Sequence, residues 1–291
     1  MKYFDLHADT PLVLDENRLN SSVIDLIHHP FEVYNQVMAV FLRDDDKNPF
    51  ESYNRRARLI KNYLSKCGFP LISNSPKGLS GAFLSVENAG FLAEDINRIY
   101  TLKNDGVVML SLTWNGDNAL ASGANGEGGI TPLGREIVRE MNSLGVALDI
   151  SHLSHKAAME GIELADKVLA SHSAVYSLNP HVRNIKDEAL LALKQKQGIV
   201  GLCFYPLFLG SEDVFEKLYK SAEYLISLGL ENCIALGSDF DGAKMSPLLS
   251  KTAHIPSLFK AFCSRGLKKS TVERIFYENA IAFLDKICEN K

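Results

Sequence analysis

Short apolar runs alternate with longer segments of helical periodicity along almost the whole chain. Eight runs are rich in β-branched residues, at residues 3–6, 37–42, 82–86, 107–112, 146–150, 168–170, 199–204 and 234–236. Most of them are separated by segments with apolar residues at helical spacing, at residues 53–64, 92–102, 133–144, 155–165, 187–196 and 215–228. Strands that alternate with helices are joined by crossovers and run parallel. Eight such units in about 250 residues predict a closed (β/α)8 barrel of the TIM type.

The pattern favours a single domain over residues 1–291, since no internal repeat, low-complexity tract or linker divides it. The clearest helix boundaries are Thr131 as N-cap, Pro132 at the first helical position and Gly145 after the last. An open doubly wound sheet is the alternative, but no glycine-rich phosphate-binding turn follows the first run. After the last run, residues 257–263 and 271–288 are expected to complete the outer helical layer.

Composition excludes several classes of function. The chain has 31 Lys and Arg against 35 Asp and Glu and no basic cluster, which argues against nucleic-acid binding. Its five cysteines form no CxxC pair, so neither a disulfide framework nor a cysteine zinc site is expected. No apolar run approaches the roughly 20 residues needed to cross a bilayer, and no signal segment precedes the first run. We therefore expect a cytoplasmic protein without membrane contact.

Metal-binding residue types follow several of the runs, where the chemistry of a (β/α)8 barrel lies. Each alone has an ordinary explanation, such as a hydrogen-bonded core histidine, a helix cap or a surface turn. Their joint occurrence at successive strand ends indicates a shared site. They are His7 and Asp9 after the first run, Glu87 after the third, His152 after the fifth, His172 after the sixth, and Asp239 and Asp241 after the eighth.

Three histidines and at least three carboxylates exceed what one tetrahedral ion needs, so two metal ions are the economical interpretation. Glu87 is the best bridging ligand, because a carboxylate has two oxygens and its run lies between the other two ligand groups in the sequence. Two bridged cations lower the pKa of a shared water and polarise a carbonyl, which suits amide hydrolysis.

Seven segments give the chain a resemblance to the membrane dipeptidase (renal dipeptidase) family of the metal-dependent amidohydrolase superfamily. They occur in the family's order and span nearly the whole predicted barrel. The segments are FDLHADT (4–10), SVENAG (85–90), LDISHLS (148–154), ASHSAVY (170–176), HVRNI (181–185), GLCFYP (201–206) and GSDFDG (237–242).

The resemblance implies two zinc ions per chain and a role for each matching residue. It implies that a hydroxide bridging the metals attacks the peptide bond of a dipeptide, and that the protein is a homodimer. Arg183 would bind the substrate's C-terminal carboxylate, as a guanidinium can, unless it forms only a surface salt bridge. Tyr205 would line the pocket, or only pack in its wall. His7 and Asp9 would hold one ion, His152 and His172 the other, Glu87 would bridge them, and Asp239 would transfer the proton.

The chain departs from the family after the fourth run, where characterised members carry a substrate-binding histidine. Here the sequence is LTWNGDN (112–118), and Trp114 takes the place of that histidine. An indole donates one hydrogen bond and cannot be protonated, so a polar contact to the substrate is altered. We place Trp114 and Asn115 among the substrate-binding residues. Dipeptides with a C-terminal D-residue and N-acyl amino acids are both candidate substrates.

Other readings stay open at this point. Asp241 shares its strand face with Asp239 and is the alternative proton-transfer group. Phosphotriester and lactone hydrolases of the same superfamily usually show His-x-His on the first strand and a bridging lysine, where this chain has Asp9 and Glu87. A non-catalytic barrel that binds metal or a small ligand is the alternative from another class.

Overall fold

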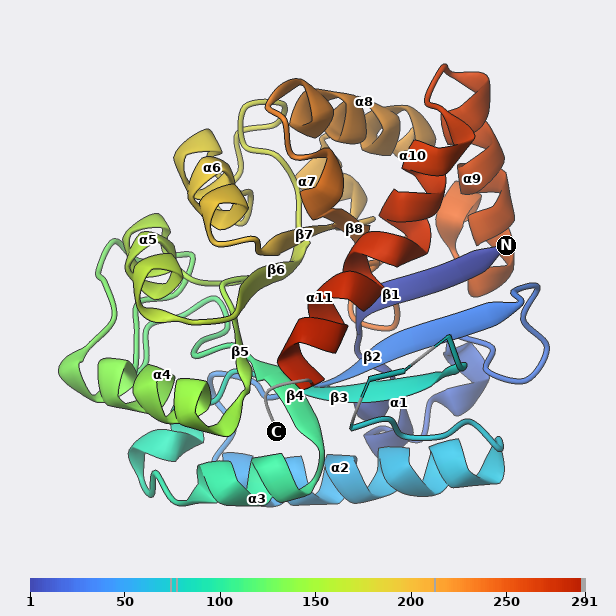
Figure 1. Cartoon of the computed structure of the whole chain (residues 1–291). Coiled ribbons are helices and arrows are strands. Elements are labelled where there is room, and N and C mark those ends of the chain that lie inside the picture. Colours follow the sequence, from blue (N-terminus) through green and yellow to red (C-terminus); the bar gives the residue numbers. More distant parts are fainter. Residues whose placement is uncertain (74, 77, 212, 289–291) are drawn as a thin grey trace.

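Eight parallel strands form one sheet in the order of the sequence, in a computed structural model that describes residues 1–73, 75–76, 78–211 and 213–288. Every predicted strand is present, and the helices surround the sheet (Figure 1). The (β/α)8 prediction is therefore confirmed. The strands are β1 Lys2–Ala8, β2 Val33–Phe41, β3 Gly81–Glu87, β4 Val107–Leu110, β5 Ala147–Asp149, β6 Val168–Ser173, β7 Ile199–Leu202 and β8 Ile234–Leu236.

Most helices follow the predicted periodicity, and some short ones were not indicated by the sequence pattern. The predicted segment 92–102 is not one helix, because a 3-10 helix, Gly90–Ala93, is followed by an α-helix that begins only at Arg98. The N-cap Thr131 accepts a hydrogen bond from the Gly134 amide, and Gly145 is left-handed with φ of 62°, as expected for the helix between them. The helices are α1 Thr10–Asp15, α2 Pro49–Lys66, α3 Arg98–Asn104, α4 Pro132–Leu144, α5 His155–Leu164, α6 Asp187–Gln195, α7 Pro206–Leu209, α8 Val214–Ser227, α9 Ile255–Ser264, α10 Lys269–Glu273 and α11 Asn279–Cys288.

The first and last strands meet and close the ring. Ala8 forms a parallel bridge with Phe240, and the Asp9 amide donates to the Phe240 carbonyl at 2.8 Å. Below this bridge, the buried Asp5 carboxylate accepts from the Ser238 amide at 2.8 Å and the Ser238 hydroxyl at 2.6 Å. The end of β1 is thus fixed against the segment that follows β8.

The last helix lies across one mouth of the barrel rather than in its outer layer (Figure 1). Its buried side chains, including Phe283 and Leu284, join an apolar cluster to which every strand contributes, with Phe4, Leu6 and Phe83 among them. These strand residues precede the carboxyl ends, so α11 seals the opposite mouth from the predicted site. The expectation that residues 271–288 complete the outer layer is wrong for α11, because helical periodicity reveals an apolar face but not its partner.

Two strands carry an extra residue near their carboxyl ends. On β1, Asp5 pairs with Gln36 and Ala8 with Met38, so three steps on β1 match two on β2. On β6, Ala170 pairs with Val200 and Ser173 with Leu202, which is the same mismatch. Such a bulge shifts the alternation of side chains by one residue.

Among the described helices, none combines the length and the apolar character that a membrane crossing requires.

Candidate metal centre and active site

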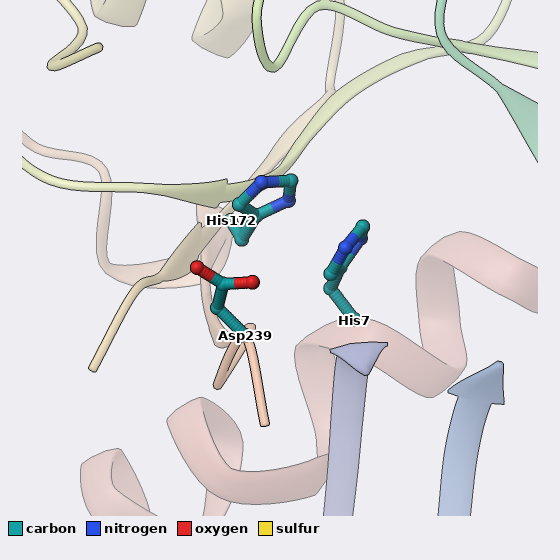
Figure 2. Close-up of side chains that lie close together, drawn as sticks. All are labelled: His7, His172 and Asp239. Carbon is teal, nitrogen blue, oxygen red and sulfur yellow. The ribbon is translucent and has the colours of Figure 1, made fainter. Parts of the chain in front are cut away.

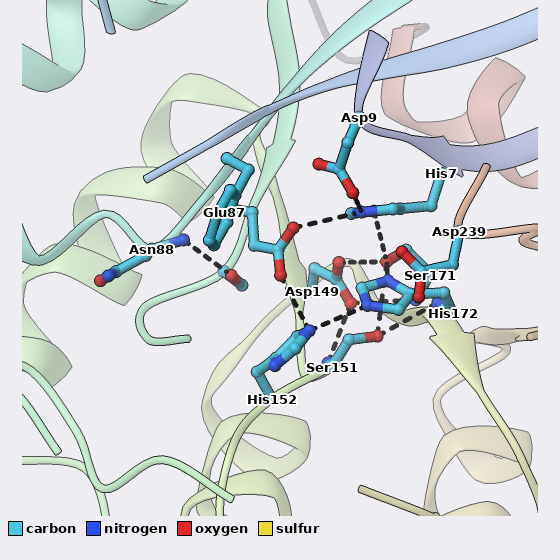
Figure 3. Close-up of polar contacts among 12 residues, drawn as sticks. His7, Asp9, Glu87, Asn88, Asp149, Ser151, His152, Ser171, His172 and Asp239 are labelled. Atoms are coloured by element: carbon cyan, nitrogen blue, oxygen red, sulfur yellow. Dashed lines mark hydrogen bonds and ion pairs between the residues drawn. The ribbon is translucent and has the colours of Figure 1, made fainter. Parts of the chain in front are cut away.

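The five predicted metal ligands meet at the carboxyl ends of four strands (Figure 3). All are buried, with exposed fractions of 7 % or less. Glu87 lies at the centre: its Oε2 is 3.2 Å from His7 Nε2 and its Oε1 is 2.8 Å from His152 Nε2. His152 Nε2 is also 2.9 Å from His172 Nε2. One carboxylate therefore contacts both groups of ligands.

Three overlapping groups have potential ligand atoms within 4.8 Å of one another. Two of these groups, one with His7 and one with His152, share Glu87, as a bridged pair of ions requires. The third places Asp239 between histidines that belong to the other two groups (Figure 2). The groups are His7 with Asp9 and Glu87, Glu87 with His152 and His172, and His7 with His172 and Asp239.

The unpaired atoms of this cluster fit a cation. His7 Nε2 and Asp9 Oδ1 are buried and make no hydrogen bond within the described part of the chain. Burial, with the nearby Arg183 guanidinium, lowers the pKa of His152 to about 4. Burial and the neighbouring His7 hold the pKa of His172 well below its usual range. Both rings are therefore neutral near pH 7, as metal-binding histidines must be.

Asp239 and Asp241 lie in different surroundings. Burial raises the pKa of Asp239 well above its usual range, and the Asp9 carboxylate adds to this. Among the described residues, the donor recorded for its Oδ2 is a weak one, the Cys203 thiol at 3.9 Å. Asp241 instead accepts hydrogen bonds from the Thr10 hydroxyl at 2.7 Å, the Ser22 hydroxyl and the Val23 amide. Asp241 anchors the segment after β1, which leaves Asp239 as the free carboxyl at the cluster.

Left-handed backbone is concentrated at these strand ends. Of the six non-glycine residues with positive φ in the described part of the chain, four are Asn88, His152, Asp239 and Asp241. They follow β3, β5 and β8, next to the ligands or among them. Such conformations are costly and persist where surrounding contacts impose them. The contacts around these strand ends therefore hold the local backbone in place.

A cavity of about 290 Å³ opens onto the cluster and is lined by three of the four predicted substrate-binding residues, Trp114, Asn115 and Tyr205. Trp114 packs edge-on against Phe41, with ring centroids 5.1 Å apart, and forms an apolar wall. Asn115 also has a task that the sequence did not suggest, because its Oδ1 lies 2.9 Å from His152 Nδ1. This contact orients the ring of a predicted ligand histidine, a task separate from the predicted contact of Asn115 with substrate.

Arg183 is a buried cation without an anion. Its side chain is 7 % exposed and forms no ion pair with a carboxylate in the described part of the chain. One Nη donates to the His172 carbonyl at 3.2 Å, and the guanidinium lies 5.2 Å from the centroid of Phe208. Its Nε has no hydrogen-bond partner among the described residues. A surface salt bridge is therefore not its role. An unpaired buried guanidinium suits a site that receives a carboxylate.

The sequence reasoning assigned no role to Asp149 or Ser171, although both stand in the quoted segments 148–154 and 170–176. The structure buries both beneath the histidines, where Ser171 Oγ is 2.8 Å from His172 Nδ1. The only signal in the sequence was their position beside His152 and His172.

The barrel and its overlapping groups of potential ligands define a (β/α)8 protein whose strand ends could hold metal. The sequence profile of the membrane dipeptidase family, peptidase family M19, matches residues 71–291. The chain belongs to this family.

Individual relatives agree with this assignment. The chain is 34 % identical over 164 residues to a dipeptidase, tcpJ, from Claviceps purpurea, and 31 % identical over 186 residues to an uncharacterized dipeptidase from Schizosaccharomyces pombe. These matches cover 55 % and 60 % of this chain but only 39 % and 46 % of the relatives.

Solved structures share the fold over the whole chain. A family M19 dipeptidase superimposes with a TM-score of 0.90 at 22 % identity, covering 99 % of both chains. A metallopeptidase from Rhodobacter sphaeroides, solved with a phosphinate mimic of the dipeptide L-Ala-D-Ala, gives a TM-score of 0.87 at 21 % identity, again over 99 % of both chains. At these identities the likeness establishes the barrel fold.

Proposed function

We propose that this protein is a dipeptidase that uses two zinc ions per chain. The observation that carries the proposal is the Glu87 carboxylate, whose two oxygens face His7 on one side and His152 on the other. Membership of peptidase family M19 supports the reaction class. His7, Asp9 and Glu87 would hold one ion, and Glu87, His152 and His172 the other. Bound there, the ions would polarise the scissile carbonyl and lower the pKa of the attacking water.

The chain's own residues divide the remaining tasks. Arg183 binds the free C-terminal carboxylate of the substrate, which gives its buried charge a partner. Asp239 accepts a proton from the attacking water and returns it to the leaving amine. Its position between His7 and His172 and its raised pKa both suit a group that must hold a proton between two steps.

The cavity favours a small substrate with an apolar portion. The wall formed by Trp114 and Phe41 offers aromatic surface, while the ligand cluster forms the polar floor. We propose dipeptides as substrates, including those with a D-residue at the C-terminal position, for which the ligand of the Rhodobacter structure is a precedent. N-acyl amino acids share the carboxylate and the amide, and they are the second substrate class to test.

A substrate panel with metal control tests this proposal. Purified enzyme is assayed against dipeptides with an L- or a D-residue at the second position and against N-acetyl amino acids, with zinc present and after chelation. We expect hydrolysis of dipeptides that stops on chelation and returns with zinc. Full activity after chelation, or no hydrolysis across the panel by zinc-loaded protein, would overturn it.

The single domain over residues 1–291, the cytoplasmic location and the homodimer stay predictions. Limited proteolysis, cell fractionation and light scattering of the purified protein would check them in turn.

A further inference from the structure

A buried pair, Asp149 and Ser171, lies directly beneath the histidines of the metal cluster (Figure 3). Asp149 is the last residue of β5, and Ser171 lies on the neighbouring β6. Their exposed fractions are 6 % and 0 %. Neither belongs to a ligand group, and the proposed mechanism does not use them.

The hydrogen bonds of this pair have a definite direction. Asp149 Oδ1 accepts from the backbone amides of Ser151 at 3.0 Å and Ser171 at 2.9 Å, and Oδ2 accepts from the Ser171 hydroxyl at 2.5 Å. An ionised carboxylate only accepts hydrogen bonds, and a hydroxyl has one proton to donate. The proton of Ser171 is thus directed at Asp149, and the Ser171 oxygen is left as an acceptor.

Two ligand histidines approach that oxygen. His172 Nδ1 lies 2.8 Å from Ser171 Oγ, and His7 Nδ1 lies 3.4 Å from it. The remaining neighbour is the Ser151 hydroxyl at 3.4 Å. Because the Ser171 oxygen can only accept, each histidine must carry its proton on Nδ1. A histidine that binds a metal ion carries a single proton; here that proton lies on Nδ1, which leaves Nε2 to face the cluster as the metal-binding nitrogen.

The half of the cluster around His152 also presents only acceptor atoms. Asn115 Oδ1 accepts from His152 Nδ1, so His152 Nε2 is unprotonated as well. His152 Nε2, His172 Nε2 and Glu87 Oε1 then face one another, with 2.9 Å between the two nitrogens and 2.8 Å from His152 to the carboxylate. When each ring carries its single proton on Nδ1, these acceptor atoms have no hydrogen between them, and a bound cation would offset their repulsion.

The bulge on β6 makes this arrangement possible. On a regular strand, adjacent residues point to opposite faces. Here the extra residue between Ala170 and Ser173 lets both Ser171 and His172 face the barrel interior, so that the serine reaches the ring of the next residue.

We propose that Ser171, held by Asp149, is a positioning residue that fixes the ring orientation and tautomer of one histidine in each half of the metal site. The proposal rests on the proposed two-ion site. One hydroxyl serves His172 from one ligand group and His7 from the other, so its loss weakens both ions together.

The sharpest test is Asp149→Asn, which keeps size and shape but can reverse the hydrogen bond. The side-chain amide would donate to Ser171 Oγ, and the serine would then donate to His172 Nδ1 and move the ring proton to Nε2. Zinc affinity is measured by competition with a chromophoric chelator, and zinc content by elemental analysis. We expect Asp149→Asn and Ser171→Ala to weaken zinc binding by about 10- to 100-fold, at both ions.

The matched control is Ser151→Ala. Ser151 is also buried, and its hydroxyl accepts from the His172 backbone amide at 3.2 Å and lies 3.4 Å from Ser171 Oγ, but it bonds to no histidine ring in the described part of the chain. It should bind zinc within about twofold of wild type, and melting curves of the metal-free variants identify any loss of folding. If Asp149→Asn fails to fold, Ser171→Ala decides. Wild-type affinity in the folded variants, or an equal loss in Ser151→Ala, would overturn the proposal. Wild-type protein that binds no zinc would instead refute the metal site, and binding without hydrolysis would refute only the dipeptidase activity.

Discussion

Asp239 and Asp241 are two residues apart, yet their surroundings predict opposite consequences of substitution. Asp239→Asn removes the carboxyl that we propose accepts and returns the proton, but keeps its size. We expect zinc content to stay at the wild-type level while kcat falls by about 10²- to 10⁴-fold. Steady-state kinetics with elemental analysis of the same sample checks this. A kcat within a few fold of wild type would exclude the role of Asp239.

Asp241→Asn is the matched control for that experiment. Asp241 accepts three hydrogen bonds from the segment that follows β1, so its loss should lower the melting temperature. The kcat of the folded variant should change by no more than a few fold. The reverse pattern in the two variants would show that Asp241 transfers the proton.

Arg183 predicts a preference for substrates with a free carboxylate. Arg183→Met removes the guanidinium, and we expect KM for an unmodified dipeptide to rise by about 10- to 100-fold, since a hydrogen bond to a charged group contributes about 1.5–3 kcal/mol. The same dipeptide with an amidated C-terminus should be a poor substrate for both proteins, with little difference between them. An equal loss on both substrates would show that Arg183 does not read the carboxylate.

At the scale of elements, the apolar runs were sufficient to predict all eight strands and their order, because each run becomes a buried parallel strand. Short helices escaped the pattern, since α1 and α7 have six and four residues and offer too few turns for a period to show. The bulges on β1 and β6 were also out of reach. A shift of one residue depends on the neighbouring strand, and it decides that Ser171 and His172 both face inward.

The candidate site, too, was predictable from the sequence only in part. Histidines and carboxylates at strand ends were visible as residue types, so the cluster could be predicted before the structure. The contacts that give a side chain a particular partner were not visible in the sequence, because they depend on which atoms face one another in the folded chain. Asn115 beside His152 is one example, and Asp241 bound to Thr10 is another.

The short helix α1 is tied to α2 by an ion-pair cluster, which makes a prediction about pH. Asp15, with a side chain 10 % exposed, accepts from Arg55 Nε at 2.6 Å and Arg56 Nε at 3.0 Å. The hydrogen bond from Arg55, helped by the one from Arg56, lowers the pKa of Asp15. Burial acts in the opposite direction but is outweighed. The stabilisation is therefore complete above the unfolded pKa of about 3.9 and is lost as the pH falls through the lower folded value.

We expect Asp15→Asn to lower the free energy of unfolding by about 1 kcal/mol at pH 7. The difference from wild type should shrink below pH 4 and vanish in stronger acid. Urea denaturation of both proteins across this range, with chelator present throughout so that metal loss does not contribute, measures it. A difference that stays constant with pH would show that the charge of Asp15 is not responsible.

In the whole molecule, the predicted metal ligands and α11 lie at opposite mouths of the barrel. The ligands lie at the carboxyl ends of the strands, and α11 seals the other mouth. Phe283 on α11 is 3 % exposed and belongs to the barrel interior. Phe283→Ala should lower the free energy of unfolding by about 3–5 kcal/mol, as core truncations of this kind do. KM and kcat of the folded fraction at low temperature should stay near wild type. A specific loss of kcat without a loss of stability would contradict this separation.

The central claim is that the strand ends hold two metal ions, one on each side of Glu87. Anomalous X-ray diffraction at the zinc absorption edge, from crystals grown with zinc, tests it most directly. We expect two peaks about 3.5–4 Å apart, one contacting His7 and Asp9, the other His152 and His172, with Glu87 between them. A single peak, or peaks away from these residues, would contradict it.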